Sequence, residues 1–220
     1  GAAVDIMHSA SLIHDDVIDG GLLRRNEKSF WKKYGTNGAI LFGDILMFRA
    51  IALLTDNPRI DLLKELINMT GEVCRSEAEQ ELILRGTSNK WNECENIARF
   101  KTGSLFAFAA VAGGSGNKKE ANALRNAGFD LGTAYQLADD ILDASGNEYL
   151  SGKTLGKDLV RGKTTAKTAY EGAPANPTKY LLNKLNNSGH YLLEWPHLYR
   201  SWNDYILEEF NPIINQFINS

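Results

Sequence analysis

Apolar residues recur along most of this chain at helical spacing, in long segments separated by short polar stretches. Positions three and four residues apart share one face of a helix, whereas a strand alternates at every second residue. On this basis we predict helices over residues 1–19, 39–54, 61–84, 91–112, 118–143, 179–185 and 198–217. The sequence shows no credible strand alternation and no short-period repeat. The pattern therefore predicts an all-α protein.

Two polar stretches between the predicted helices differ from ordinary short turns. Residues 20–38 form a basic connection, and residues 151–165 form a loop rich in glycine and lysine. The helices have wide apolar faces, which are typical of a bundle with a buried interior or of packing against a partner subunit. With 220 residues the chain can bury one sizeable core. We therefore expect a single domain over residues 1–220, folded as a helical bundle.

Two acidic motifs of the form D-D-x-x-D each follow an apolar helical run. Their carboxylates belong to Asp15, Asp16, Asp19, Asp139, Asp140 and Asp143. The outer two aspartates of each motif share a helix face, and they crowd the negative end of the helix dipole. One such cluster is typical of a solvated helix end. Two copies indicate a shared cation site, and Mg²⁺ prefers oxygen ligands of this kind.

Basic residues accompany both acidic motifs. They are Arg24, Arg25, Lys101, Lys153, Lys157 and Lys163. Arginine can bind phosphate through two parallel hydrogen bonds, and lysine binds it as a point charge. Metal-binding carboxylates, fixed cations and apolar helices together predict a site for a phosphorylated, apolar molecule. Because no Ser, Cys or His nucleophile with a partner is evident, we expect catalysis through electrostatic stabilisation of a departing diphosphate.

Two further motifs would indicate other functions, and neither is supported. Residues 152–154 and 162–164 resemble the end of a phosphate-binding P-loop, but both lack its upstream glycine and a preceding strand. An adjacent His-Asp pair, such as His14-Asp15, is also typical of HD-type phosphohydrolases. Those enzymes need further metal-binding histidines. Only three other histidines are present, and that assignment leaves the second acidic motif unexplained.

Composition and charge narrow the partners and the compartment. The net charge of −3 gives no electrostatic reason to expect nucleic acid. Cys74 and Cys94 lack metal-binding spacing, so a reduced, cytoplasmic location is the simplest fit, although one disulfide would also be compatible. The longest apolar run, residues 105–114, is shorter than the roughly 18 residues of a membrane span. We therefore expect no transmembrane segment.

In chain order the sequence contains H-D-D-V-I-D-x-x-x-x-R-R, K-T-G, Y-Q-L-A-D-D-I-L-D and G-K-x-x-G-K-D-L-x-x-G-K. In these motifs it resembles the trans-isoprenyl diphosphate synthases over nearly all of residues 1–170. The resemblance implies the all-α isoprenoid synthase fold around a central active-site cavity, and a homodimer. It also implies a prenyltransferase that condenses an allylic diphosphate with isopentenyl diphosphate, head to tail. The implied cofactor is Mg²⁺, with about three ions per site once diphosphate is bound.

The resemblance implies roles for residues at matching positions. The metal ligands would be Asp15, Asp16, Asp19 and Asp139, supported by Asp140 and Asp143. The allylic diphosphate would contact Arg24, Lys101 and Lys153, beneath a closing loop that contains Asp158 and Lys163. Isopentenyl diphosphate would contact His8 and Arg25, and the nascent cation would face Thr102 and Gln136.

Several of these residues also have a purely structural explanation. Thr102 and Gln136 fit helix packing or backbone capping equally well, and His8 fits a hydrogen-bonded core position. The basic residues of the two loops fit a solvated surface. These alternatives stay open at the level of sequence.

The helix before the first acidic motif is expected to set product length, because the growing tail should run along it. Four and five residues before Asp15 stand Ser11 and Ala10, both small, and Met7 lies one turn deeper. Small residues leave room in a closely packed interior, so we expect a product of about twenty carbons or longer. We expect Ala10→Phe to shorten it.

One motif of these synthases, G-K-x-x-R, is not found upstream, since every Gly-Lys pair lies after residue 150. We expect N-terminal helices that carry it to be outside this sequence. Two alternatives remain. A class I terpene cyclase shares the fold and the first motif, but its second site usually reads N/D-x-x-S/T-x-x-x-E. A non-catalytic subunit of a heteromeric synthase tends to lose one aspartate motif, whereas both are whole here.

Overall fold

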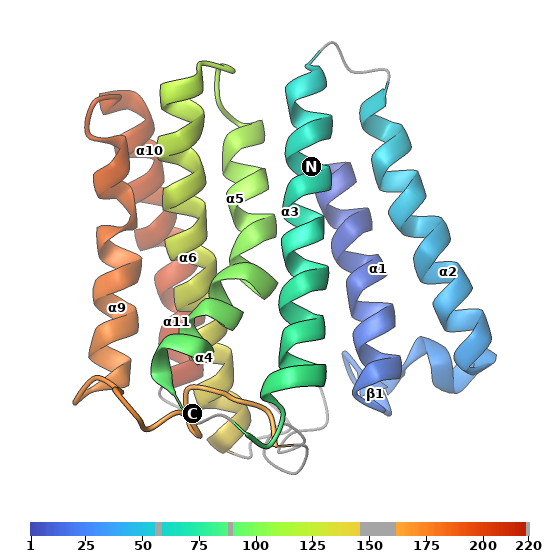
Figure 1. The fold of residues 1–220 in the computed structure, drawn as a ribbon. Coiled ribbons are helices and arrows are strands. Elements are labelled where there is room, and N and C mark those ends of the chain that lie inside the picture. Colours follow the sequence, from blue (N-terminus) through green and yellow to red (C-terminus); the bar gives the residue numbers. More distant parts are fainter. Residues whose placement is uncertain (56–58, 88–89, 146–161, 219–220) are drawn as a thin grey trace.

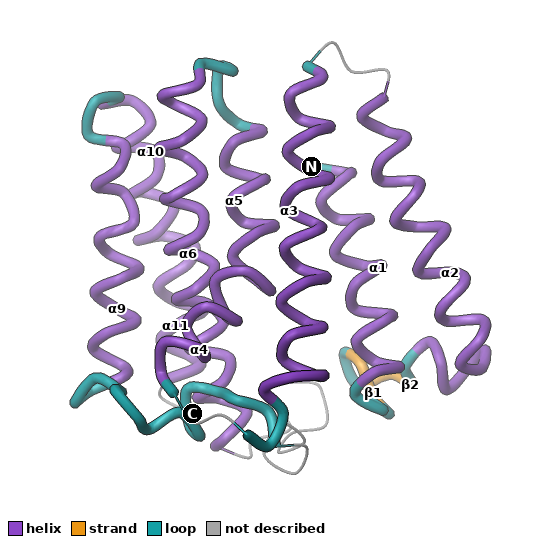
Figure 2. Tube along the Cα trace, in the orientation of Figure 1, coloured by secondary structure: helices purple, strands orange, loops and turns teal. Residues whose placement is uncertain are grey.

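The structure, a computed structural model, describes residues 1–55, 59–87, 90–145 and 162–218. Within these ranges nearly all regular structure is helical (Figure 2), which confirms the all-α prediction. The α-helices are α1 (Ala2–Ile18), α2 (Phe30–Thr55), α3 (Ile60–Glu79), α4 (Trp91–Ile97), α5 (Gly103–Ala112), α6 (Lys118–Ser145), α9 (Pro177–Asn187), α10 (Pro196–Tyr205) and α11 (Asn211–Ile218). Shorter π-helical or 3-10 segments are η1 (Gln80–Leu84), η2 (Ala98–Thr102), η3 (Ser188–Leu192) and η4 (Ile206–Phe210).

The helices stand side by side in one bundle (Figure 1). Helix α6 packs against α5 on one side and α9 on the other, while α3 lies between α5 and the pair formed by α1 and α2. One apolar core joins α1, α2, α3, α5 and α6 around Met7, Leu66 and Phe108. A second joins α4, α6, α9 and the C-terminal helices around Leu137 and Leu181. Because α6 contributes to both cores, it is the central helix of the bundle.

The connection after α1 is more ordered than its polar sequence suggests. Strands β1 (Leu23–Arg24) and β2 (Glu27–Lys28) pair antiparallel, so the expectation of no strand needs a small correction. Two-residue strands are too short to show alternation. The turn between them consists of Arg25 and Asn26 with φ of 52° and 63°, as a two-residue hairpin turn of the primed type requires.

Helix α2 begins earlier than predicted and is kinked. Its first residue is Phe30, and Gly35 breaks the helical path with φ 80° and ψ 161°. A positive φ is readily adopted only by glycine, which explains why the kink falls there. Basic residues interrupt the apolar pattern in this stretch, so periodicity did not predict that the helix begins here.

Helix α2 bears on the expectation of no transmembrane segment, which stays a prediction. Among the described residues it is one helix long and apolar enough to cross a membrane, judged by length and composition alone. The earlier expectation counted uninterrupted apolar runs, whereas the apolar stretch of α2 accommodates Asp44 and Arg49. Asp44 lies 3.5 Å from the His14 imidazole of α1, so the two helices are tied together on one side. In the same helix Leu41, Ile45 and Phe48 are exposed.

Candidate active site

A cavity of about 690 Å³ lies among α1, α3, α5, α6 and α11. Both acidic motifs reach it: Asp15, Asp16 and Asp19 from the end of α1, and Asp139 and Asp140 from α6. Segments about 120 residues apart in sequence thus face one space, as the two motifs predict. Asp143 was assigned to the same metal site, but its side chain lies outside the described residues.

In the first motif the middle aspartate differs from the outer two. Asp16 is buried, and its carboxylate accepts hydrogen bonds from Arg24 Nη2 at 2.8 Å and from Nε at 3.4 Å. A Cβ at Gly21 would lie 2.8 Å from Asp16 Oδ1, so the chain can turn this closely only at glycine. Asp16 therefore fastens the hairpin to α1, while Asp15 and Asp19 face the cavity one turn apart.

In the second motif the middle aspartate likewise differs from an outer one. Asp140 is buried and accepts two hydrogen bonds, from Gln136 Nε2 at 2.8 Å and from the Ala166 N–H at 2.9 Å. Asp139 lines the cavity from the neighbouring position on α6. Asp140 thus holds the residues that follow the Gly- and Lys-rich loop against α6, whereas Asp139 occupies the position of an outer, cavity-facing carboxylate.

The carboxyl group of Asp15 is electrostatically perturbed. Desolvation by burial, together with the charges of Glu77 and Asp19, raises its pKa to about 6, against the lowering effects of Lys101 and Lys163. Carboxylates that repel one another in a desolvated cavity gain from a bound cation. The electrostatics of this part of the cavity therefore favour a metal ion beside Asp15.

Lys101 and Thr102 belong to η2, where the helix between α4 and α5 widens to π-helical form. Such bulges displace side chains from their usual face and often occur at functional sites. Lys101 pairs with Glu77 of α3. Burial alone would lower the pKa of the Lys101 ammonium, but Asp15, Glu77 and Asp19 outweigh it and raise that pKa. Lys101 therefore stays charged inside the cavity.

Thr102 and Gln136 form part of a hydrogen-bonded chain across the cavity wall. The Thr102 hydroxyl donates to Gln136 Oε1 at 2.5 Å, and Gln136 in turn donates to Asp140. The helix-packing role left open for Thr102 and Gln136 is thus present, and both residues also line the cavity. Their oxygen dipoles are held in place by Asp140 and by each other.

His8, Arg24 and Arg25 line one side of the same cavity. The pKa of the His8 imidazole is lowered by partial burial and by both arginines, so a neutral ring is favoured. Arg25 occupies a hairpin-turn position with positive φ, a conformation that non-glycine residues adopt only when neighbouring structure enforces it. These three predicted substrate residues are therefore brought together.

Lys163 reaches the cavity from the segment that follows the loop. Its ammonium lies 2.7 Å from Asp19 Oδ1 and 3.4 Å from Glu81 Oε1, and the side chain is buried. Lys153 and Asp158, expected in the same loop, lie outside the described residues.

A second, largely apolar cavity of about 440 Å³ adjoins the first between α1, α2 and α3. Ser11 lines both cavities, and Met7 lines the apolar one. Ala10 is fully buried and lines neither. The three residues predicted to measure product length thus occupy different environments.

Two glutamates near the site did not stand out in the sequence. Glu77 lies near the end of α3 and Glu81 lies four residues further on in η1, and both line the apolar cavity. Glu77 also lines the larger one. Their i, i+4 spacing, which repeats that of Asp15 and Asp19, was the available signal. Nothing in the sequence places them beside Lys101 and Lys163.

The donor set suits magnesium. Within the described parts of the chain, no three ligating side chains cluster closely enough to hold a metal by themselves. Mg²⁺ usually binds through one or two carboxylates and completes its shell with water and substrate phosphate. Asp15, Asp19 and Asp139, spread around one cavity, fit that mode of binding.

An all-α bundle with two acidic motifs facing one cavity has the architecture of the isoprenoid synthase fold. A family model of polyprenyl synthetases matches residues 1–191, and the chain belongs to this family. Octaprenyl diphosphate synthase of Haemophilus influenzae is 34% identical over 167 residues, which cover 74% of this chain and 50% of that protein. Geranylfarnesyl diphosphate synthase of Methanosarcina mazei is 40% identical over 147 residues, covering 64% and 48%.

Solved structures agree on the fold. A polyprenyl synthase from Caulobacter crescentus, complexed with calcium and isoprenyl diphosphate, has a TM-score of 0.81 at 25% identity, covering 93% of this chain and 76% of that one. A decaprenyl diphosphate synthase from Rhodobacter capsulatus has a TM-score of 0.80 at 22% identity, covering 99% and 77%. The chain spans about half the length of the first two relatives.

Proposed function

We propose that this chain carries the active site of a trans-prenyltransferase, which condenses an allylic diphosphate with isopentenyl diphosphate to give a linear polyprenyl diphosphate. The observation that carries the proposal is the convergence of Asp15, Asp19 and Asp139 on one cavity that also receives Lys101 and Lys163. Membership of the polyprenyl synthetase family supports it independently.

The first step is cleavage of the bond between the allylic carbon and the diphosphate oxygen. The electron pair leaves with the diphosphate, and Lys101, Lys163 and Arg24 stabilise the charge that develops there. Lys153, expected to contact the same diphosphate, stays part of the proposal. Magnesium, held by the cavity-facing aspartates, would supply Lewis-acid neutralisation of the same group, with about three ions per site.

The second step joins the two substrates. The isopentenyl double bond attacks the allylic cation and forms the new carbon–carbon bond, and the resulting cation then loses a proton to the released diphosphate. Oxygen dipoles of Thr102 and Gln136 face the space where positive charge develops. His8 and Arg25 hold the isopentenyl diphosphate on the opposite side, beside the hairpin turn.

The growing tail enters the apolar cavity between α1, α2 and α3. The two cavities share Ser11, Val73 and Leu105 among their lining residues, so an allylic chain can pass from one to the other. Small Ser11 leaves this passage open, and Met7 lines the space beyond it. We therefore propose a product of about twenty carbons or longer.

The chain acts as a homodimer in this proposal. Helix α2 exposes Leu41, Ile45 and Phe48, with Phe48 72% exposed, whereas monomeric proteins seldom leave large contiguous apolar patches uncovered. A second copy would cover this face. Both cysteines are free, which suits a reducing, cytoplasmic location.

One assay tests the function. Purified protein is supplied with magnesium, labelled isopentenyl diphosphate and allylic primers of several lengths, and products are separated by chromatography. Elongated linear products are expected, and Asp15→Asn should abolish them. Cyclised hydrocarbons would instead indicate a terpene cyclase, and no turnover without an added partner would indicate a non-catalytic subunit.

A further inference from the structure

The end of α3 and the start of η1 carry an acidic face that belongs to neither D-D-x-x-D motif. Glu77 and Glu81 are largely buried, with only 12% and 13% of their side chains exposed. Glu77 lines both cavities where they meet. Burying an ionised carboxylate is costly unless a cation or hydrogen-bond donor compensates, so the partners of Glu77 indicate its role.

Glu77 lies between two lysines that come from distant parts of the chain. Lys101 of η2 pairs with Glu77 Oε2, and the Lys163 ammonium lies 3.9 Å from Oε1. The Lys163 ammonium also forms ion pairs with Asp19 and Glu81. A single carboxylate in the cavity wall thus contacts two cations, each expected to meet diphosphate.

The backbone on either side of Lys163 is docked on η1 and on the turn that follows it. The buried Gln80 amide donates to the Thr164 carbonyl at 3.3 Å, and the Gly86 N–H donates to the Gly162 carbonyl at 2.8 Å. A Cβ at Gly162 would come within 3.3 Å of the Gly86 backbone. Lys163 is therefore held at its main chain as well as at its ammonium group.

We propose that Glu77 is a positioning residue for the diphosphate site, which holds the Lys101 and Lys163 ammonium groups in place before substrate arrives. The inference rests on the proposed function, because diphosphate is the ligand that the two lysines serve. Preformed cations bind an anion more tightly than flexible ones, since their ordering does not have to accompany binding.

Loss of the Glu77 charge has a second consequence. Among the described residues, Asp15 and Asp19 are further carboxylates that act on Lys101 electrostatically. A Lys101 that turned toward Asp15 would leave the diphosphate and at the same time occupy a metal ligand. Glu77 therefore keeps the lysine and the metal-binding aspartate apart.

The test is calorimetric binding of inorganic diphosphate in the presence of Mg²⁺. Glu77→Gln keeps the size of the side chain and removes its charge, and we expect about tenfold weaker binding. Glu79→Gln is the matched control, because Glu79 lies exposed on the same helix. In kinetics, KM for the allylic diphosphate should rise about tenfold, while KM for isopentenyl diphosphate stays unchanged.

A double mutant separates positioning from general stability. Because Glu77 acts through both Lys101 and Lys163, the loss of diphosphate affinity in Glu77→Gln combined with Lys101→Met should be smaller than the sum of the two single losses. Fully additive losses would overturn the proposal, as would wild-type affinity in Glu77→Gln. Should Glu77→Gln fail to fold, Glu77→Asp keeps the charge at shorter reach. An intermediate loss is then expected, and unchanged affinity would count against the inference.

The outcomes also distinguish this inference from the proposed function. If the wild-type protein elongates primers and Glu77→Gln matches it in diphosphate affinity and KM, only the role of Glu77 is wrong. If the wild-type protein binds diphosphate but forms no elongated product, the proposed function fails, and the binding comparison still decides the role of Glu77.

Discussion

The Arg24 guanidinium donates hydrogen bonds from two nitrogens to the Asp16 carboxylate, at 2.8 and 3.4 Å. This contact connects β1 to the end of α1. Asp140 has a matching position in the second motif, where it accepts from Gln136 and from the Ala166 backbone. In both motifs the middle carboxylate accepts hydrogen bonds that fasten another segment to its helix, and an outer one lines the cavity. Substitutions at the two kinds of position should therefore have different effects.

Asp16→Asn tests the structural half of this division. Its loss of charge leaves Arg24 with a weaker partner, and a pair with one buried member usually contributes more than a surface pair. Because Arg24 is about a third exposed, water compensates in part. We expect the free energy of unfolding to fall by about 1–2 kcal/mol in urea denaturation. Asp5→Asn, an exposed change on the same helix, should alter it by a few tenths at most. Equal effects would contradict the assignment.

The pH dependence of stability tests the state of Asp15. Its pKa is about 6 in the folded protein and near the ordinary 3.8 when unfolded, so between these values the folded state holds a proton that the unfolded chain has released. The contribution of this group therefore stabilises the metal-free protein at low pH and is lost as the pH rises from about 4 to 6. Its size is on the order of 3 kcal/mol. Urea denaturation at pH 4 and pH 7 measures most of it.

Two comparisons check the origin of that dependence. Asp15→Asn should remove it and should make the metal-free protein more stable at pH 7 than the wild type, since one repulsive charge is gone. Magnesium should reduce the dependence in the wild type, because a bound cation lowers the pKa of its ligand. An unchanged slope in Asp15→Asn would assign the effect to other groups.

Product length offers a test in which neighbouring residues behave differently. Ser11 lines both cavities, so Ser11→Phe should narrow the passage and shorten the product with little loss of stability. Ala10 is fully enclosed, so Ala10→Phe must force its ring into packed space, at a cost of about 1–3 kcal/mol. Chromatography of products and thermal denaturation measure the two effects. A stable Ala10→Phe protein with shortened product would show that the tail passes by Ala10 instead.

The contact between α1 and α2 depends on a glycine. A Cβ at Gly43 would lie 2.2 Å from Nε2 of His14, whose ring also contacts the Ile40 carbonyl at 3.1 Å. Gly43→Ala should therefore displace the ring and destabilise the protein by about 2 kcal/mol, although alanine is the better helix former. At Gly38 a Cβ meets only an ordinary contact of 3.5 Å with Tyr34, so Gly38→Ala should be neutral or stabilising. Thermal denaturation of both variants tests this, and equal midpoints would refute it.

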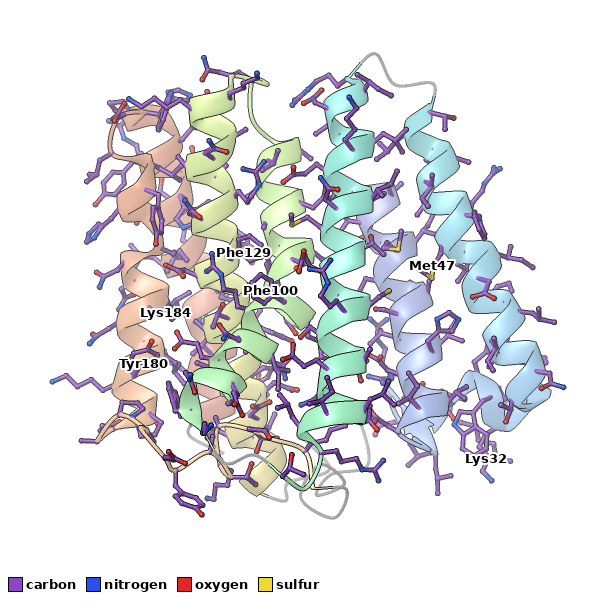
Figure 3. The ribbon with its side chains drawn as sticks, in the orientation of Figure 1. Lys32, Met47, Phe100, Phe129, Tyr180 and Lys184 are labelled. Carbon is purple, nitrogen blue, oxygen red and sulfur yellow. The ribbon has the colours of Figure 1, made fainter. Side chains whose placement is uncertain are left out.

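A partly buried ionic network links α9 to α4 and α6, and Figure 3 labels its residues Lys184 and Tyr180. Lys184 of α9 lies 2.9 Å from Glu95 and 3.4 Å from Asp130, and Tyr180 donates to Glu95 at 2.7 Å. Lys184→Met would leave two partly buried carboxylates with less compensation, so we expect a loss of about 2–3 kcal/mol in unfolding free energy. KM for both substrates should not change. Lys179→Met, exposed on the same helix, is the control; a raised KM in Lys184→Met would reveal coupling to the site.

Most helices follow from apolar periodicity, because a bundle buries one face of each helix. The prediction for residues 1–19 nearly coincides with α1, and residues 118–143 fall within α6. Periodicity missed the hairpin after α1, whose strands are only two residues long, and the start of α2 at Phe30, where lysines interrupt the apolar pattern. Local pattern carries little information where segments are this short or this mixed.

The candidate site was predictable where residues close together in the sequence carry the chemical signal. Carboxylates at i, i+4 on two helices indicate a shared cation, and the cavity brings Asp15 and Asp139 together. The role of Glu77 was not predictable, because its partners Lys101 and Lys163 are brought to it only by the packing of α3 against η2 and the later segment. The different environments of Ala10 and Ser11 likewise depend on which neighbour lies across the helix.

The division within each aspartate motif separates two kinds of mutational tolerance. Loss of an outer carboxylate removes chemistry from a chain that still folds, whereas loss of Asp16 or Asp140 releases segments that the fold must hold. A descendant that gave up catalysis would thus be free to change Asp15 or Asp139 while it retained both middle aspartates. Which half of the motif survives in a divergent sequence would then tell whether that protein has kept the reaction or only the scaffold.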